Sequence, residues 1–414
     1  MTHVSQKIGI VGGGIVGICT ALSLQEAGHR VTLIDRDAPG QGASFGNAGI
    51  ISPWSIIPQA MPGIWKQIPG MLLRPNGPAA ISLRHGPGYL PWLMKFLRQS
   101  SQDNVEATSE AMQFLCGDAI SLYRQHLKGT GHEDLIADSM YVHAFRDAKA
   151  ADLDGLGYRM RREAGADLEL IEASDLRELE PDLSHDYQAA ILIKGQARAR
   201  DPGRIGAVLA QKIQSNGGTV LQETVQDLRP QNLQWQVLTD AKTHVFDKVV
   251  LSAGIWSADI LRKLGLRVPL AAERGYHVAY NGVAARLNNS VMDVDEMAVA
   301  SSMINGLRVA GTAEFGSIST PASPKRVENM RRIAERMVPS LKDTAFEPWM
   351  GIRPSFPDSL PLIEEFKQHP GLIGAFGHSH YGLMMAPKTG RIVADIVERK
   401  PLNRDLSPYA AERF

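Results

Sequence analysis

The stretch at residues 7–37, KIGIVGGGIVGICTALSLQEAGHRVTLIDRD, constrains the fold of this chain most strongly. An apolar strand at 8–11 runs into the spacing Gly12-x-Gly14-x-x-Gly17, and a helix to 27 and a second strand at 31–34 follow. The first glycine permits a tight turn, the second lets backbone approach a pyrophosphate, and the third packs the helix against the strand. The pattern predicts a βαβ unit with a dinucleotide at the helix N-terminus.

Asp35 ends the second predicted strand, where a carboxylate can accept hydrogen bonds from both ribose hydroxyls of an adenosine. The same acid would repel the 2′-phosphate of NADP. The motif by itself leaves FAD and NAD open. The residues of this unit that we expect at the cofactor are Gly12, Gly14, Ile15, Val16, Gly17, Asp35 and Arg36.

Three further segments have the small residues of a backbone wrapped tightly around a ligand. They are PGQGASFGNAGIISP at 39–53, VVLSAGIWS at 249–257, where an apolar strand at 248–251 breaks into a helix, and GHSHYGLMMAPKTG at 377–390. A plain surface loop and an ordinary strand entering a helix are the alternatives for the first two. We expect Pro387 in the first turn of a helix, where its missing N–H costs nothing. The further expected cofactor contacts are Ser44, Asn47, Ala48, Gly49, Ile50, Val225, Ala253, Gly254, Trp256, Gly377, Tyr381, Gly382, Leu383 and Met384.

These four blocks, in this order and across nearly the whole chain, resemble the D-amino acid oxidase superfamily of FAD-dependent amine oxidoreductases. The chain is most similar there to D-amino acid dehydrogenases of the small-subunit type and to D-hydroxyproline dehydrogenases, with AERGYHV at 272–278 and GHSHYGL at 377–383 favouring that side. Glycine and sarcosine oxidases of the same superfamily resemble this sequence less closely. The resemblance implies noncovalent FAD, because neither Cys19 nor Cys116 lies where some relatives attach the flavin. It also implies that residues 377–384 run along the flavin ring.

The resemblance further implies oxidative deamination of a D-amino acid, cyclic substrates such as D-hydroxyproline and D-proline included. Hydride would pass from Cα to flavin N5, giving an imine and then a 2-oxo acid, with the electrons going on to a quinone or a partner protein. An oxidase that uses oxygen on glycine, sarcosine or a D-amino acid stays open. So does a flavin-binding subunit that acts within a multi-subunit complex.

Four residues are candidates for the chemistry. Arg353 in GIRPSFPDSLP matches the family's substrate-carboxylate arginine, and a guanidinium binds a carboxylate bidentately; an arginine that holds a domain junction is the alternative. Tyr276 is expected to donate a second hydrogen bond to that carboxylate, or else to be an ordinary strand tyrosine. His378 and His380 could accept a substrate proton, bond the flavin or simply pack.

We expect an α/β fold with a Rossmann-type FAD-binding domain formed by residues 1–90, 150–270 and 345–414. A second, α+β substrate domain would be built from inserts at 91–149 and 271–344, an antiparallel sheet with helices. The length of 414 residues fits two joined domains.

Composition excludes other classes of protein. Lys+Arg and Asp+Glu number 44 each, which gives no basic footprint for nucleic acid. The two cysteines and the His spacing offer no metal site, and we expect none. No secretory signal or long apolar span is apparent, which favours a cytoplasmic protein.

An apolar stripe follows the proline- and tryptophan-rich segment at 52–78. Tyr89, Trp92, Leu93, Phe96 and Leu97 share one helical face. A pocket wall is one interpretation. A patch that docks on a membrane or an electron acceptor is the other. Oligomerisation stays open.

Overall fold

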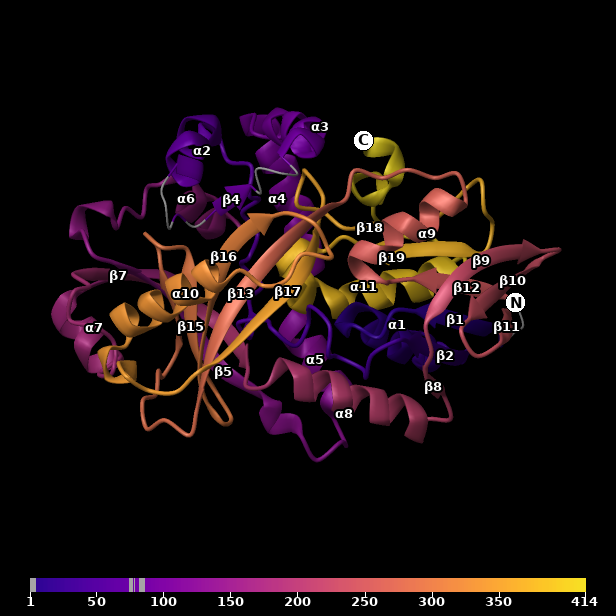
Figure 1. Ribbon diagram of the computed structural model, residues 1–414, viewed down its shortest axis with the longest axis horizontal. Helices are drawn as coiled ribbons and strands as arrows, with labels where there is room; N and C mark the ends of the chain where they lie inside the picture. The colour runs from indigo at the N-terminus through magenta and orange to yellow at the C-terminus, as the bar shows by residue number, and fades with distance from the viewer. Residues whose placement is uncertain (1–4, 74–76, 78, 82–85) are drawn as a thin grey trace.

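The computed structural model describes residues 5–73, 77, 79–81 and 86–414. Part of the segment at 52–78 lies outside these ranges. Two large sheets stand beside each other along the long axis of the molecule, and both marked chain ends lie over the same half (Figure 1).

The first sheet is the predicted Rossmann-type sheet. Its order is β18-β19-β12-β1-β2-β8, parallel except for the pairing of β18 with β19. Its central strands β1, β12 and β19 are almost wholly buried and rich in apolar residues because both faces of the sheet are covered. The bounds are β1 Lys7–Val11, β2 Arg30–Asp35, β8 Thr219–Gln222, β12 Lys248–Leu251, β18 Leu362–Glu365 and β19 Leu372–Phe376.

Alternate residues of these strands enter two different cores. Ile8 and Ile10 pack with helices α1 (Ile15–Glu26), α8 (Pro202–Ser215) and α11 (Gly382–Val397). Val11 and Leu251 pack on the other side, against α9 (Ser257–Lys263) and a three-stranded sheet of β9 (Val225–Gln231), β10 (Gln234–Thr239) and β11 (Thr243–Phe246). The strand, glycine turn and helix predicted at the N-terminus are confirmed within this layer.

The second sheet is mixed and has the order β17-β13-β16-β15-β14-β5-β7-β3, with β4 beside β16 and β6 beside β7. Helix α10 (Pro324–Met337) packs on one face, and the opposite face looks toward the first sheet. The bounds are β3 Ile50–Ile51, β4 Ala79–Ile81, β5 Ile136–Phe145, β6 Leu168–Glu172, β7 Ala189–Ala199, β13 Ala271–Asn281, β14 Ser290–Asp293, β15 Ala298–Met303, β16 Gly306–Phe315 and β17 Glu347–Ser355.

Sheet membership cuts across the expected domain boundaries. Strands β3, β4, β6, β7 and β17 lie in the second sheet, although we expected 1–90, 150–270 and 345–414 to belong to the FAD-binding domain. The reason is long-range pairing: β7 is antiparallel to β5, and β17 is antiparallel to β13. We therefore propose to divide the domains by sheet rather than at residues 150 and 345.

Further α-helices surround these layers: those at 102–116 and 119–127 pack on α11 in the core of the first sheet, and the one at 173–179 packs beside β6 and β7. The further helices are α2 (Ile64–Leu73), α3 (Gly86–Arg98), α4 (Gln102–Cys116), α5 (Ala119–Leu127), α6 (Leu156–Glu163) and α7 (Ala173–Leu179). Within the described ranges, no helix combines the length and the apolar character that a bilayer span requires.

The prediction for Pro387 was wrong. Helix α11 begins at Gly382, so Pro387 lies inside the helix rather than in its first turn. Its missing N–H leaves the carbonyl of Leu383 without a helical donor. The buried hydroxyl of Tyr123 donates to that carbonyl at 2.7 Å, which allows the helix to continue.

Candidate active site

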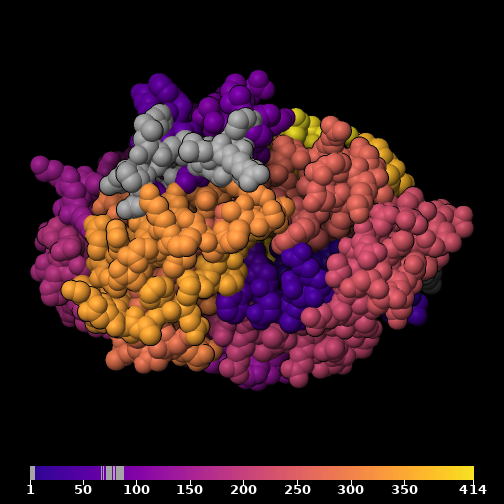
Figure 2. Space-filling model, in the orientation of Figure 1, coloured from indigo at the N-terminus to yellow at the C-terminus, as the bar shows by residue number. Residues whose placement is uncertain are grey.

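One cavity of about 1070 Å³ joins the N-terminal glycine loop to the C-terminal segment at 377–384. Figure 2 shows the indigo N-terminal residues recessed between the orange residues of the second sheet and the salmon segment that follows β12. All four chemical candidates and almost all expected cofactor residues line it. The lining residues include Gly12, Gly14, Ile15, Val16, Asp35, Arg36, Ser44, Asn47, Ala48, Ile50, Val225, Ala253, Gly254, Trp256, Arg353, Gly377, His378, His380, Tyr381, Gly382, Leu383 and Met384.

Gly17 and Gly49 do not line the cavity, so their expected contact with the cofactor is corrected. A Cβ on Gly17 would lie 1.9 Å from the carbonyl oxygen of Gly12, and one on Gly49 would lie 2.5 Å from that of Ala199. Both glycines allow close backbone packing behind the cavity wall.

The glycine loop itself has the features of a pyrophosphate cradle. Gly12 has φ +113°, and a Cβ there would lie 2.3 Å from the carbonyl oxygen of Ser252. The N–H of Gly13 donates to Asp35 at 2.5 Å, and the N–H of Ile15 donates to the Ser44 hydroxyl at 3.0 Å. A diphosphate could therefore approach bare backbone at the start of α1.

Asp35 and Arg36 form the adenosine end of this cradle. Asp35 lines the cavity at the end of β2, where its carboxylate can receive ribose hydroxyls. The guanidinium carbon of Arg36 lies over the ring of Trp256, 4.0 Å from the ring centre, which is a cation–π contact. Both side chains support the expectation of an adenine dinucleotide.

The loop at 42–49 is held by an arginine that the sequence did not single out. Arg308 of β16 is buried, and its Nη1 donates to the carbonyls of Phe45 and Asn47 at 2.8 Å each. Burial lowers the pKa of Arg308 to about 10, which still leaves it charged at neutral pH. No local motif marks this residue, because its partners lie more than two hundred residues away.

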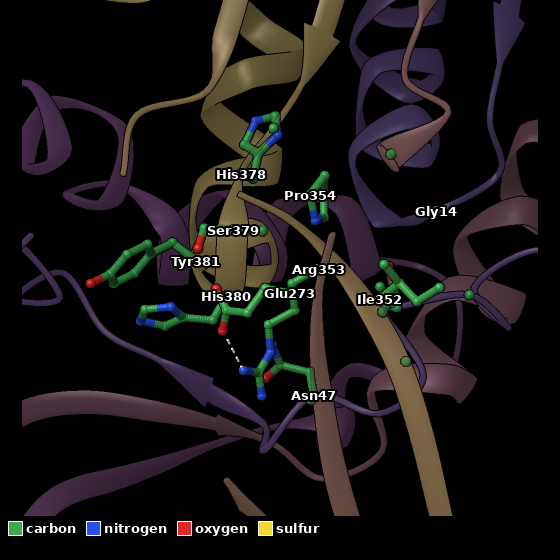
Figure 3. Close-up of a pocket in the computed structure, with 18 of the residues that line it drawn as sticks. Gly14, Asn47, Glu273, Ile352, Arg353, Pro354, His378, Ser379, His380 and Tyr381 are labelled. Carbon is green, nitrogen blue, oxygen red and sulfur yellow. Dashed lines mark hydrogen bonds and ion pairs between the residues drawn. The ribbon is translucent and has the colours of Figure 1, made fainter. Parts of the chain in front are cut away.

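At the other end of the cavity, Arg353 lies across β13. Its Nη1 donates to Glu273 at 2.7 Å and to the carbonyl of Thr312 at 3.2 Å (Figure 3). A Cβ on Gly275 would lie 2.4 Å from the guanidinium carbon of Arg353, so any side chain at position 275 would occupy the space that the guanidinium now fills. In the described chain, Nε and Nη2 hydrogen-bond to no other residue, and Arg353 lines the cavity. That edge of the fork is available for a carboxylate.

Glu273 was missed by the sequence reasoning and is only 1% exposed. The hydroxyl of Ser355 donates to its second oxygen at 2.7 Å. Burial opposes ionisation of Glu273, but the charge of Arg353 and these hydrogen bonds outweigh it and lower its pKa. Register explains the pair, since Glu273 stands opposite Arg353 in the β13–β17 ladder.

The two histidines differ in position. His380 lies beside Glu273 and Arg353, whereas His378 stands apart at the start of the helix (Figure 3). The Nε2 of His378 is 3.0 Å from the Thr389 hydroxyl of α11, and burial lowers its pKa to about 3. These contacts favour packing, the third of its expected roles. The pKa of His380 is lowered to about 4, first by burial, and its Nδ1 lies 3.2 Å from the Gln59 amide nitrogen.

Tyr276 does not fit the role that we expected. Its hydroxyl donates to Glu314 at 2.5 Å and accepts from the N–H of Ser323 at 3.2 Å. Odd and even positions of a strand point to opposite faces, so Tyr276 and Glu273 differ in face: Tyr276 packs in the core with α10, although the residue also borders the cavity. A substrate carboxylate at Arg353 would lie across the sheet from this hydroxyl.

The apolar stripe of α3 forms a wall of the same cavity. Tyr89, Trp92, Leu93 and Phe96 line it, and the indole N–H of Trp92 donates to the carbonyl of Ser355 at 3.1 Å. The pocket-wall interpretation of the stripe fits these contacts.

The cavity also includes polar residues that no sequence signal indicated. Tyr141 and His143 of β5 and Arg161 of α6 line it beyond Tyr381. Their spacing in the sequence is ordinary for a strand and a helix, and only the fold brings them to one wall.

Residues 7–396 match the family model described as FAD dependent oxidoreductase. The chain belongs to this family. It is 36% identical to the D-amino-acid oxidase of Bradyrhizobium diazoefficiens, over 99% of each chain. It is 29% identical to D-amino acid dehydrogenase 2 of Mesorhizobium japonicum, over 95% of this chain and 97% of that one. These findings confirm the resemblance seen in the sequence.

Solved structures of the same fold agree with this assignment. The glycine oxidase of Geobacillus kaustophilus has a TM-score of 0.76 at 23% identity, over 99% of each chain. The L-proline dehydrogenase of P. horikoshii has a TM-score of 0.77 at 18% identity, over 99% of this chain and 98% of that one. The α/β fold prediction is confirmed. As a member of this family the chain is an FAD-dependent oxidoreductase, and FAD is its cofactor.

Proposed function

We propose that the chain oxidises the amine of a D-amino acid to an imine, which water hydrolyses to a 2-oxo acid and ammonium. The single observation that carries this proposal is the open edge of Arg353, which lies in the same cavity as the FAD cradle. The names of the relatives, D-amino-acid oxidase and D-amino acid dehydrogenase, support the same substrate class.

FAD, when bound, supplies the acceptor for the hydride that leaves the substrate carbon. Arg353 binds the substrate carboxylate through Nε and Nη2. Glu273 and the carbonyl of Thr312 hold the opposite edge of the guanidinium, so its plane is fixed before the substrate arrives. The chain thus contributes chiefly by orientation, which is worth large factors in rate when the reacting atoms are held in place.

His380 is a hydrogen-bond partner rather than a base in this proposal. Its pKa of about 4 keeps the ring neutral at pH 7 and makes it a poor proton acceptor. With Gln59 donating to Nδ1, the neutral ring carries its proton on Nε2. The substrate amine therefore loses its proton to solvent before or during binding, and the free amine is the reactive form.

The electron acceptor has two candidates. A quinone or a partner protein is the acceptor expected from the dehydrogenase resemblance. Oxygen is the second candidate, favoured because the relative at 36% identity is named an oxidase while the dehydrogenase is 29% identical. A docking surface for a membrane or protein acceptor would lie at α2 and α3, where Trp65 and Leu90 are 59% and 58% exposed.

The test is anaerobic mixing of the purified holoprotein with a panel of D- and L-amino acids, D-proline, hydroxyprolines, glycine and sarcosine. We expect bleaching of the flavin band by D-amino acids and not by their L-enantiomers. Bleaching by L-amino acids alone would refute the proposal. Hydrogen peroxide formed on aerobic turnover would identify oxygen as the acceptor.

Arg353→Met tests the clamp within the same assay. We expect a loss of roughly 100-fold or more in kcat/KM with FAD retained, since two charge-assisted hydrogen bonds disappear. Arg332→Met, at an exposed position of α10, is the matched control. Equal kinetics in both variants would remove Arg353 from this role.

A further inference from the structure

Arg161 is a cationic group at the substrate end of this cavity that the proposed chemistry does not use. It belongs to α6, and its Nε donates to the carbonyl of Trp54 at 3.1 Å while Nη1 donates to that of Gly157 at 3.2 Å. The guanidinium lines the cavity, and in the described part of the chain Nη2 hydrogen-bonds to no residue. One N–H edge therefore remains open to a ligand.

No carboxylate in the described ranges pairs with Arg161. Its polar neighbours are the hydroxyls of Tyr141, Tyr158 and Tyr381, which stay protonated because burial raises their pKa values. His143 on the same wall is neutral, since burial holds its pKa well below 6.5. The charge of Arg161 is thus uncompensated, although removing a cation from water costs several kcal/mol without a partner.

The other charges of the cavity do not correct this imbalance. Four of the described carboxylates that line it belong to the dinucleotide half: Asp35, Asp37, Glu223 and Asp259. At the substrate end, Glu273 is the lining carboxylate in the described chain, and it already pairs with Arg353. The substrate end therefore carries one net positive charge, centred on Arg161.

Tyr381 connects the two arginines in space. Its ring contacts that of His380, with 3.8 Å between ring centres, and His380 lies beside Glu273 and Arg353 (Figure 3). The charges of Arg161 and Glu273 both act on the Tyr381 hydroxyl. Arg161 thus lies one aromatic ring beyond the proposed carboxylate clamp, within the same cavity.

We propose that Arg161 binds a second carboxylate of the substrate, so that the preferred substrates are acidic D-amino acids. This inference rests on the proposed function. The α-carboxylate binds at Arg353, and the side-chain carboxylate extends past Tyr381 to the open edge of Arg161. An acidic amino acid carries one more negative charge than a neutral one, and that charge balances Arg161.

Anchoring of the loop at 52–58 is the competing role, because Arg161 also holds the carbonyl of Trp54. The two roles make different kinetic predictions. A loop anchor would affect all substrates alike, whereas a side-chain receptor affects acidic substrates selectively.

The experiment compares isosteric pairs, D-aspartate with D-asparagine and D-glutamate with D-glutamine, by anaerobic flavin reduction in the native holoenzyme. We expect kcat/KM for the better acid to exceed that of its amide by roughly 10- to 100-fold, the effect of one charge-assisted contact. Arg161→Met should remove this preference, because kcat/KM for the acid should fall by that factor while kcat/KM for its amide and for D-alanine falls much less. Arg161→Lys should keep part of it.

Arg162→Met is the matched control, since Arg162 is the next residue of α6 and pairs at the surface with Asp154. An equal loss for acids, amides and D-alanine in Arg161→Met would overturn the inference in favour of a loop anchor or an α-carboxylate site. The native enzyme offers a test that needs no variant: absence of any preference for acids, with neutral D-amino acids still bleaching the flavin, refutes the inference and leaves the proposed function standing. Failure of every D-amino acid would instead refute the proposed function.

Discussion

Gly275 offers the sharpest test of the clamp, because a single methyl group there must displace the guanidinium of Arg353. A Cβ at this position would lie 2.3 Å from Nη2, 2.4 Å from the guanidinium carbon and 2.7 Å from Nε. Ordinary contact begins at 3.4 Å, so Gly275→Ala moves the group outward by about 1 Å. The obstructing atoms are the end of a flexible side chain, so we expect the variant to fold.

A displacement of about 1 Å in a positioning group can cost 100-fold in rate. We therefore expect Gly275→Ala to lower kcat/KM for the best D-amino acid by roughly 10- to 100-fold, or about 1.4 to 2.7 kcal/mol. The ion pair with Glu273 should lengthen but persist, so the melting temperature and the flavin content should change little.

The assay is anaerobic stopped-flow reduction, with FAD content and thermal unfolding measured on the same samples. Gly88→Ala is the control, because a Cβ on this exposed glycine of α3 would meet none of the described atoms within 4 Å. In an Arg353→Lys background, Gly275→Ala should have little further effect, because the planar fork is already absent. Native kinetics in Gly275→Ala, or equal losses in both backgrounds, would refute the reasoning.

Three further outcomes follow from other contacts. Asp35→Asn should weaken FAD binding by roughly 10- to 100-fold, measured by flavin release on dilution, because a charged acceptor for the ribose is lost. His378 has a pKa of about 3 in the folded chain against 6.5, so only the unfolded chain is protonated as the pH falls below 6.5. The contribution of His378 should therefore lower the free energy of unfolding by up to about 1.4 kcal/mol per pH unit between pH 6.5 and 3. In His378→Asn this part of the pH dependence should be absent from denaturant unfolding curves. Tyr123→Phe should lower the free energy of unfolding by about 1 to 3 kcal/mol, because the Leu383 carbonyl loses its donor; adding Pro387→Ala should restore part of it.

Local signals predicted the dinucleotide half of the site well. The glycine spacing, the strand that ends at Asp35 and the turn at Ala253 each depend on contacts within one supersecondary unit, so a short window of sequence contains them. The cavity accordingly brings together almost every expected cofactor residue. Gly17 and Gly49 differ because glycine marks close packing as readily as ligand contact.

The substrate half depends on long-range register, which the sequence alone could not provide. Glu273 meets Arg353 only because β13 and β17 pair in one register, eighty residues apart. Strand alternation then turns Tyr276 to the far face. The sequence pattern did not show which face of β13 each residue occupies. Because side chains alternate along a strand, an error of one residue in that assignment moves every side chain to the other face.

The ion pair between Arg353 and Glu273 also changes what the clamp can select. When a guanidinium is already neutralised by an ion pair, the direction of its remaining N–H groups, on Nε and Nη2, attracts a carboxylate more than net charge does. Binding of the α-carboxylate should then depend weakly on ionic strength. The net positive charge of the substrate end resides on Arg161 instead, where a long-range attraction persists because the surroundings are partly desolvated. Orientation at one arginine and charge at the other would together distinguish substrates by how many carboxylates they carry.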